Sequence, residues 1–85
     1  ITEQSILAYN NIKTVLAEFG ANMSNIAEET YYVTGVQEVM GNVEKVVAAR
    51  ESAYGEQAEV SETLVGVTAL VDPTLKIEIK CVAHL

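Results

Sequence analysis

The sequence contains few of the residues on which metal sites and nucleophilic enzyme sites depend. Its 85 residues include one histidine, one cysteine, one proline and no tryptophan. A single histidine excludes a histidine-based metal cluster, and a single cysteine excludes an internal disulfide. We therefore expect no metal ion and no other cofactor. Cys81 is interpreted as a small apolar residue in a reducing compartment, and His84 as an exposed residue at a strand end.

Basic residues and long apolar runs are scarce as well. Five Lys and Arg stand against twelve Asp and Glu, which gives a net charge of −7. Such a chain repels phosphate backbones, so we expect no nucleic acid partner. No apolar run approaches the roughly 18–20 residues that span a bilayer, and no signal-peptide pattern is visible. We predict a soluble, cytoplasmic protein with no membrane partner.

Apolar residues, by contrast, are abundant. They make up 49% of the sequence, which is generous for a chain that forms one small domain over residues 1–85. A domain of this size buries only about 60–65% of its unfolded surface. Burial between subunits is the simplest use of the surplus, so we expect the chain to assemble with copies of itself.

The first half of the sequence predicts a helix and a strand. Apolar residues at helical spacing predict a helix over residues 2–19, with Thr2 as its N-cap and Gly20 as its left-handed end. The apolar face of this helix comprises Tyr9, Ile12, Leu16 and Phe19. Residues 30–34 are β-branched or aromatic and predict a strand within residues 26–34.

A second helix is predicted over residues 36–54, despite the helix-breaking tendency of Gly41. Gly55 ends it, and a loop over residues 56–61 follows. Its predicted inner face comprises Val36, Val39, Val43, Val46 or Val47, and Arg50.

The C-terminal part, residues 62–85, predicts two strands that meet at an Asp72-Pro73 turn and form a hairpin. The second strand alternates, with its apolar face formed by Leu75, Ile77, Ile79, Cys81, Ala83 and Leu85. The element order is helix, strand, helix, strand, strand. It indicates an α+β fold with two helices on one face of a sheet.

Two sets of residues on the strands are candidates for chemistry. Glu78 lies mid-strand between Lys76 and Lys80. It is either part of a solvated charge ladder or a general base held on a rigid strand. Of the adjacent Tyr31 and Tyr32, one is expected in the core, and the other is then free to contact a ligand.

Three segments carry a resemblance to a known family. Residues 11–16, Asn-Ile-Lys-Thr-Val-Leu, and the following Gly20 are similar to a family helix Asn-x-x-x-Val-Leu…Gly. Residues 30–34 are similar to a strand Thr-Val-Tyr-Val, and residues 76–83 to a closing segment Val-Glu-Ile-Glu-Ala-Ile-Ala. With these segments the chain resembles the Rid/YjgF family of enamine/imine deaminases, also called endoribonuclease L-PSP, over nearly its whole length.

The resemblance implies a chorismate-mutase-like α+β fold and a homotrimer whose sheets form a central barrel. Small-molecule ligands then lie in clefts between subunits. In deaminating members a strand arginine grips the substrate carboxylate, and a glutamate helps to place the attacking water. The glutamate corresponds to Glu78.

The chain departs from the family pattern in two places. Glu62 and Thr63 stand where the family has Arg-Ser. An anion in place of this arginine should repel α-imino acids. In addition, the family opens with a further hairpin and strand that this sequence does not contain, so the sequence is expected to be N-terminally incomplete.

Two functions from different classes follow. The first is an atypical Rid-family hydrolase or deaminase, in which Glu78 and Glu62 are the candidate catalytic residues and Thr63 and Tyr32 contact a small imine, enamine or amide. The second is a trimer that binds a small molecule without turning it over, which the loss of the arginine favours. The acidic charge of the chain opposes the ribonuclease function that the family's second name suggests.

Overall fold

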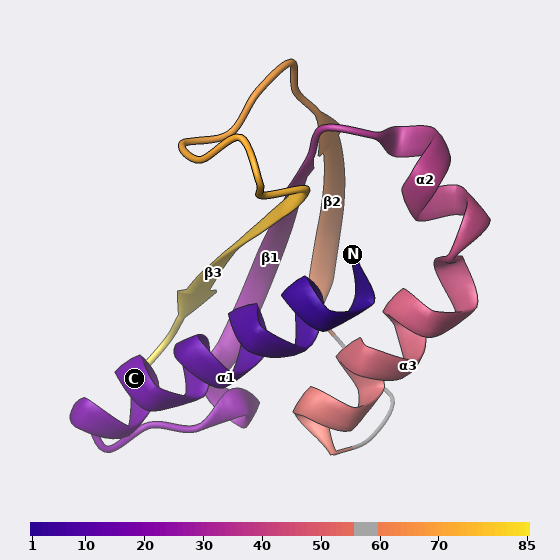
Figure 1. Ribbon diagram of the computed structural model, residues 1–85. Coiled ribbons are helices and arrows are strands. Elements are labelled where there is room, and N and C mark those ends of the chain that lie inside the picture. The colour runs from indigo at the N-terminus through magenta and orange to yellow at the C-terminus, as the bar shows by residue number, and fades with distance from the viewer. Residues whose placement is uncertain (56–59) are drawn as a thin grey trace.

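The computed structural model describes residues 1–55 and 60–85 (Figure 1). Its elements are helix α1 (Thr2–Glu18), a 3₁₀ turn η1 (Met23–Asn25), strand β1 (Ile26–Val33), helices α2 (Val36–Gly41) and α3 (Val43–Tyr54), and strands β2 (Ser61–Gly66) and β3 (Ile77–Ala83). The α+β fold is therefore confirmed. The predicted loop over residues 56–61 lies, up to residue 59, outside the described residues.

The three strands form one sheet in the order β2-β1-β3. β2 runs parallel to the central β1, and β3 runs antiparallel to it. The predicted hairpin is wrong, because β2 and β3 each pair with β1 and not with each other. Residues 67–76 carry the chain from one edge of the sheet to the other, past the end of β1 (Figure 1).

The predicted turn at Asp72-Pro73 is present within this crossing segment. The Leu75 amide donates a hydrogen bond to the Asp72 carbonyl at 3.0 Å. The Asp72 carboxylate accepts from the Thr74 hydroxyl at 2.6 Å and from the Thr74 amide at 2.8 Å. These two hydrogen bonds lower the pKa of Asp72. They join residues of the turn itself and so stabilise it locally.

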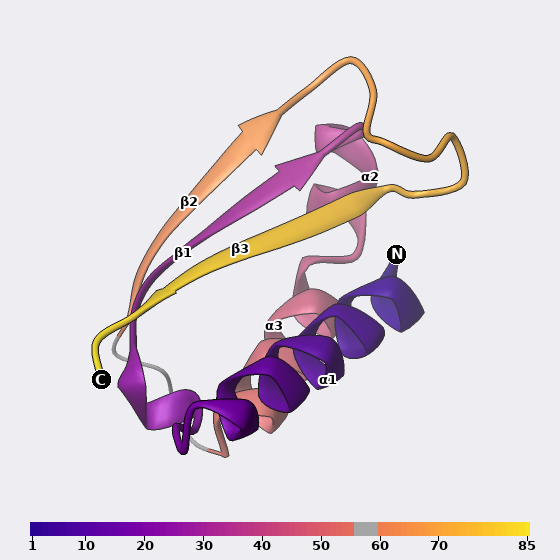
Figure 2. The ribbon, with the colours of Figure 1, turned by 90° about the vertical axis from the view of Figure 1, so that its left-hand side faces the viewer.

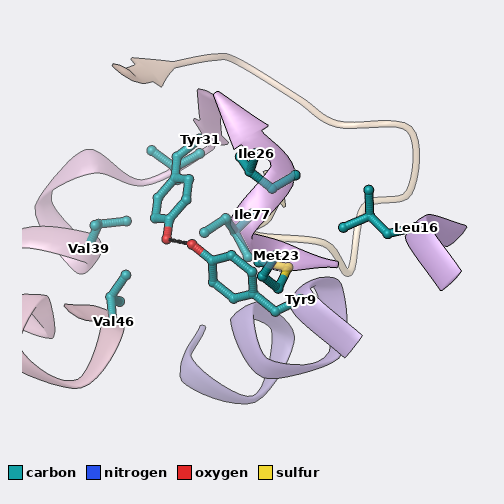
Figure 3. Close-up of a cluster of buried hydrophobic side chains, with 9 residues drawn as sticks. Tyr9, Leu16, Met23, Ile26, Tyr31, Val39, Val46 and Ile77 are labelled. Atoms are coloured by element: carbon teal, nitrogen blue, oxygen red, sulfur yellow. Dashed lines mark hydrogen bonds between the residues drawn. The ribbon is translucent and has the colours of Figure 1, made fainter. Parts of the chain in front are cut away.

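Both long helices cover the same face of the sheet (Figure 2). The core lies between the two layers and brings together side chains from every helix and from β1 and β3 (Figure 3). It comprises Tyr9, Leu16, Met23, Ile26, Tyr31, Val33, Val39, Val46 and Ile77. Each fully buried aliphatic side chain contributes about 1.5–3 kcal/mol by leaving water.

The end of α1 agrees with the sequence prediction, but its start does not. Gly20 has φ 70°, and the Ala21 amide closes back on the Leu16 carbonyl at 2.9 Å. Thr2 is already the first helical residue and makes no cap; the capping position is Ile1. Phe19 lies beyond the last helical residue and is 67% exposed, so its predicted place on the buried face is wrong.

The predicted second helix is two helices, separated at Asn42. Asn42 has φ −122° and ψ 19°, and its side-chain amide donates to the Glu38 carbonyl at 2.9 Å. That bond occupies a carbonyl which a continuous helix would use, next to the weak helix former Gly41. Gly55 ends α3 with φ 80°, as predicted.

Candidate functional site

The two faces of the sheet have different surroundings. Residues paired directly across strands project to the same face. Glu29, Tyr31 and Val33 of β1 are buried against the helices, so they define the helix-covered face. The alternate residues of all three strands form what we call the open face. It comprises Glu28, Thr30 and Tyr32 of β1, Ser61, Thr63 and Val65 of β2, and Glu78, Lys80 and Val82 of β3.

Three of the four residues predicted from the sequence lie on this open face. Glu78 pairs directly with Tyr32, and both are accessible. Thr63 pairs with Thr30, on the far side of β1 from Glu78 and one step along the sheet. The open choice between the two tyrosines is resolved, because Tyr31 is 2% exposed in the core and Tyr32 is half-buried on the open face.

The fourth residue, Glu62, lies on the helix-covered face. It pairs with Glu29 across β2 and β1, and its carboxylate is 3.8 Å from Nε of Arg50. The structure therefore separates Glu62 from Glu78 by the full thickness of the sheet. The two glutamates also lie on opposite edge strands.

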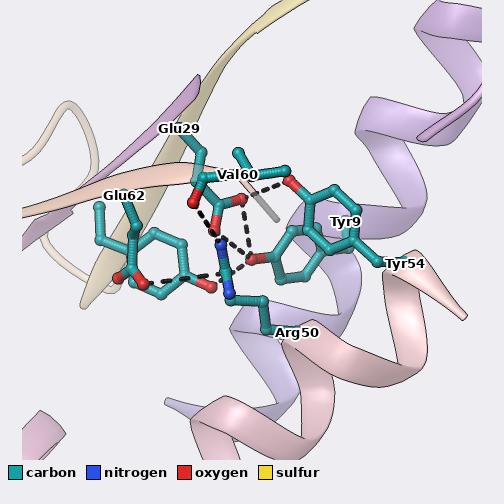
Figure 4. A network of polar contacts seen from close by, with 7 residues as sticks. Tyr9, Glu29, Arg50, Tyr54, Val60 and Glu62 are labelled. Carbon is teal, nitrogen blue, oxygen red and sulfur yellow. Dashed lines mark hydrogen bonds and ion pairs between the residues drawn. The ribbon is translucent and has the colours of Figure 1, made fainter. Parts of the chain in front are cut away.

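Glu29 is at the centre of a buried polar cluster (Figure 4). Nε of Arg50 donates to Glu29 Oε1, and the Tyr54 hydroxyl donates to Oε2 at 2.7 Å. The Tyr9 hydroxyl lies 3.2–3.3 Å from both carboxylate oxygens. Nη2 of Arg50 also donates to the Val60 carbonyl at 3.3 Å, which ties α3 to the residue before β2.

The hydroxyl protons available in this cluster determine which groups donate and which accept. The Tyr9 and Tyr31 hydroxyls are hydrogen-bonded to each other, and each carries one proton. If Tyr9 donates to Glu29, then Tyr31 donates to Tyr9 and both protons are used. Within residues 1–55 and 60–85, no buried side-chain nitrogen or oxygen lacks a partner. Both hydroxyl protons are thus used in the hydrogen bonds from Tyr31 to Tyr9 and from Tyr9 to Glu29.

Burial and the charge of Glu29 also set the acid–base properties of the cluster. Burial is the main cause that raises the pKa of Tyr9, Tyr31 and Tyr54, and the Glu29 carboxylate adds to it. Burial alone would lower the pKa of Arg50, but the hydrogen bond to Glu29 and the charges of Glu29 and Glu62 raise it overall. All four groups therefore keep their protons at neutral pH.

Cys81 pairs with Glu29 on the other side of β1. Burial, reinforced by the charge of Glu29, raises the pKa of Cys81 to about 11. A thiol with this pKa is almost entirely protonated at neutral pH and is a poor nucleophile. Cys81 is thus a small, half-buried core residue, as the sequence indicates.

The Glu29 cluster was not predicted from the sequence, although a signal was present. Glu29 shares the strand alternation of Tyr31 and Val33, and Arg50 was already expected on the inner face of its helix. Two carboxylates directly opposite on neighbouring strands repel each other. The guanidinium of Arg50 between Glu29 and Glu62 removes that repulsion. Because the Glu29 carboxylate is buried and its acceptor sites are occupied, we interpret the cluster as a structural element of the fold.

A groove of about 440 Å³ lies on the helix-covered side of the sheet, between α1 and the edge strand β3. Its walls are mostly apolar, with Gln4, Asn11 and Glu78 as the polar contributors. A concave apolar surface with few polar groups is typical of small-molecule sites. Within the described ranges no three His, Cys, Asp or Glu residues are grouped to hold a metal ion. Nor is any helix of those ranges long and apolar enough to cross a membrane.

The model of the family described as endoribonuclease L-PSP matches residues 1–85. The chain belongs to this family. A search of curated proteins finds no match. The Rid/YjgF resemblance inferred from the sequence is confirmed by both the family model and the solved structures below.

Solved structures of other members have the same fold. The Rid-family protein YyfB of Yersinia pestis superimposes with a TM-score of 0.89 at 27% identity, covering 100% of this chain and 62% of its own. A YjgF/YER057c/UK114-family protein of Mycobacterium tuberculosis gives 0.79 at 26% identity, covering 95% and 64%.

TdcF of E. coli, crystallised with bound serine, gives a TM-score of 0.79 at 20% identity, covering 96% of this chain and 62% of its own. At that identity the likeness concerns the fold alone. The endoribonuclease L-PSP family member described here therefore spans less than two thirds of the length of each of these relatives.

Proposed function

We propose that this family member hydrolyses or deaminates a small imine, enamine or amide on the open face of its sheet. The observation that carries the proposal is the direct pairing of Glu78 with Tyr32 on that face. In this register an accessible carboxylate and a tyrosine stand opposite each other on two neighbouring strands. Glu78 also borders the apolar groove that lies around the β3 edge, between α1 and β3.

The proposed reaction needs only a base and a hydrogen-bond donor. Glu78 accepts a proton from water as the water oxygen attacks the imine carbon, and the imine nitrogen takes up a proton. The resulting carbinolamine then releases ammonia and leaves a carbonyl compound, so the net reaction consumes one water. The Tyr32 hydroxyl, held across from Glu78, orients the water or the nitrogen during these steps.

The charge pattern favours a neutral or cationic substrate. The chain has a single arginine, Arg50, and its guanidinium is engaged by Glu29 and Glu62 beneath the sheet. Lys80 is the basic residue of the open face as defined above, and it lies between Glu28 and Glu78 in the register. A bidentate grip on a substrate carboxylate therefore has no counterpart on this face.

We further propose that the open face is completed by copies of the chain in a homotrimer. The helices leave this face uncovered (Figure 2), and Val82 on it is 37% exposed. A flat, uncovered sheet face becomes a water-excluding cleft only when a second surface packs against it. Light scattering is expected to give a trimer at micromolar concentration, and a stable monomer would contradict this assembly.

The catalytic proposal is tested by ammonia release from enamines that an amino-acid oxidase generates in place. Wild type should release ammonia faster than the uncatalysed background, and Glu78→Gln should lose about 10²-fold or more of that rate. Glu28→Gln is the matched control, because Glu28 is also a carboxylate of the open face but lies two register steps away. Equal rates for wild type and Glu78→Gln would exclude the catalytic role.

A second function, binding without turnover, is favoured by the engagement of Arg50 away from the open face. A thermal-shift screen of small metabolites separates the two functions. A binder is stabilised by its ligand without consuming it. RNA binding that weakens with salt would instead support the ribonuclease function, which the net charge of −7 opposes.

A further inference from the structure

A second concave surface lies between helices α1 and α3. Both helices lie on the side of the sheet opposite the open face (Figure 2). The groove has a volume of about 410 Å³, within the range that holds small ligands. It exists because α3 presents small side chains there. These are Ala48, Ala49, Ser52 and Ala53. The α1 wall adds Ile6, the buried ring of Tyr9, and the polar side chains of Thr2 and Asn10.

Each wall of the groove also carries a lysine, Lys13 on α1 and Lys45 on α3. The chain has only five basic residues against twelve acidic ones. Arg50 and Lys76 are engaged in ion pairs. Among the residues that the structure describes, neither Lys13 nor Lys45 makes one. Two basic residues therefore line one groove of an acidic protein.

The sequence around these lysines excludes an ion pair between either lysine and an acidic residue of its own helix. Intrahelical ion pairs join residues three or four apart. The positions three and four away from Lys13 are Tyr9, Asn10, Leu16 and Ala17. Those around Lys45 are Gly41, Asn42, Ala48 and Ala49. Neither lysine has an acidic residue at helix-pairing distance, although each helix carries two glutamates elsewhere.

The two lysines lie toward opposite ends of the groove. α1 and α3 run in the same direction in both views (Figures 1 and 2). Lys45 is in the first turn of α3, whereas Lys13 lines a neighbouring hollow with Tyr54, the last residue of α3. The helical rise between positions 45 and 54 is about 13 Å. Long flexible side chains can bring both ammonium groups inward from these ends.

We propose that this groove binds a short linear dicarboxylate. One carboxylate is taken by Lys13 and the other by Lys45, and the methylene chain lies on Ile6, the Tyr9 ring and the alanines of α3. Asn10 and Ser52 offer hydrogen bonds along the wall. The site is on the helices, so it is distinct from the proposed imine chemistry and does not depend on it.

Isothermal titration calorimetry with adipate and hexanoate tests the proposal, since the two probes differ by one carboxylate on a chain of equal length. Wild type should bind adipate about fivefold more tightly than hexanoate, which is the upper range for one solvent-exposed ion pair. Lys13→Gln and Lys45→Gln should each reduce adipate binding to the level of hexanoate. Both lysines are exposed, so thermal melting should show both variants folded.

Lys80→Gln is the control, because it removes the same charge from the other side of the molecule and should keep the preference for adipate. Amide shifts in NMR spectra with adipate should concentrate on α1 and α3. Equal affinity of wild type for both probes, no binding of adipate, or an equal loss in Lys80→Gln would overturn the proposal. Shifts confined to the strands would overturn it as well.

Discussion

Glu28 and Glu29 are neighbours on β1, and yet they lie in opposite surroundings. Glu29 is 2% exposed and receives hydrogen bonds from Arg50 and two tyrosines, whereas Glu28 is exposed on the open face. The pleat of one strand separates them. A buried carboxylate persists only when its acceptor sites are filled, and a filled carboxylate is not available to a substrate. The exposed glutamates retain that availability.

Tyr31 and Tyr32, further along β1, show the same contrast. Tyr31 is in the core and donates to Tyr9, while Tyr32 lies beside Glu78 on the open face. The same residue type therefore serves stability on one face and is available for chemistry on the other. The first consequence is that substitutions on the two faces should affect different measurements.

Replacing Arg50 by methionine should have the largest effect on stability. The variant leaves Glu29 buried without its counter-charge and leaves it facing Glu62 across two strands. Breaking a buried ion pair from one side costs about 3–5 kcal/mol. Urea denaturation at neutral pH measures this loss directly. Lys80→Met on the open face should change the free energy of unfolding by no more than about 0.5 kcal/mol. A loss below 1 kcal/mol for Arg50→Met, roughly that of an exposed pair, would contradict the role of the cluster.

Alkaline pH should destabilise the fold through the same cluster. The pKa values of Tyr9, Tyr31 and Tyr54 are raised in the folded state, so the unfolded chain loses these protons first. Their contribution is fully present below the unfolded pKa of about 10 and is lost as pH rises above it. Three protons give a limiting slope of about 4 kcal/mol per pH unit. Tyr31→Phe should reduce the slope by about a third, and an unchanged slope would show that Tyr31 ionises as readily in the folded protein as in the unfolded chain.

A smaller loss is expected for Tyr9→Phe. The substitution removes a hydroxyl that donates to Glu29 and accepts from Tyr31, so two buried groups lose a partner. Unsatisfied buried groups cost about 1–3 kcal/mol. Tyr32→Phe should be nearly neutral in the same urea titration but should slow ammonia release. If both variants lost equal stability, the separation of the two faces would be wrong.

The sequence alone predicted the parts of the fold that local patterns determine. Alternation in residues 75–85 correctly placed Ile77 in the core and Glu78 outside it, and Gly20 and Gly55 correctly ended their helices. Strand pairing was predicted wrongly as a hairpin, because the sequences of β2 and β3 look the same whether these strands pair with each other or with β1. Long-range contacts decide whether β2 and β3 pair with each other or with β1. The turn at Asp72 is compatible with both pairings.

The positions of the candidate residues on the sheet were predicted only in part, for a related reason. Glu78, Thr63 and Tyr32 could be assigned to strands, but the faces of β2 depend on its register with β1. That register places Glu62 under the sheet with Arg50, where the linear sequence offered no link between positions 50 and 62. A charged residue that shares the parity of core residues, as Glu29 does, is the signal for such a cluster.

The most direct test of the whole account compares Glu78→Gln with Glu62→Gln in ammonia release and in urea denaturation. Both substitutions remove one carboxylate from an edge strand, and they differ in the face of the sheet. The account predicts that Glu78→Gln loses activity with unchanged stability, while Glu62→Gln keeps activity. Loss of activity in Glu62→Gln with full activity in Glu78→Gln would contradict it.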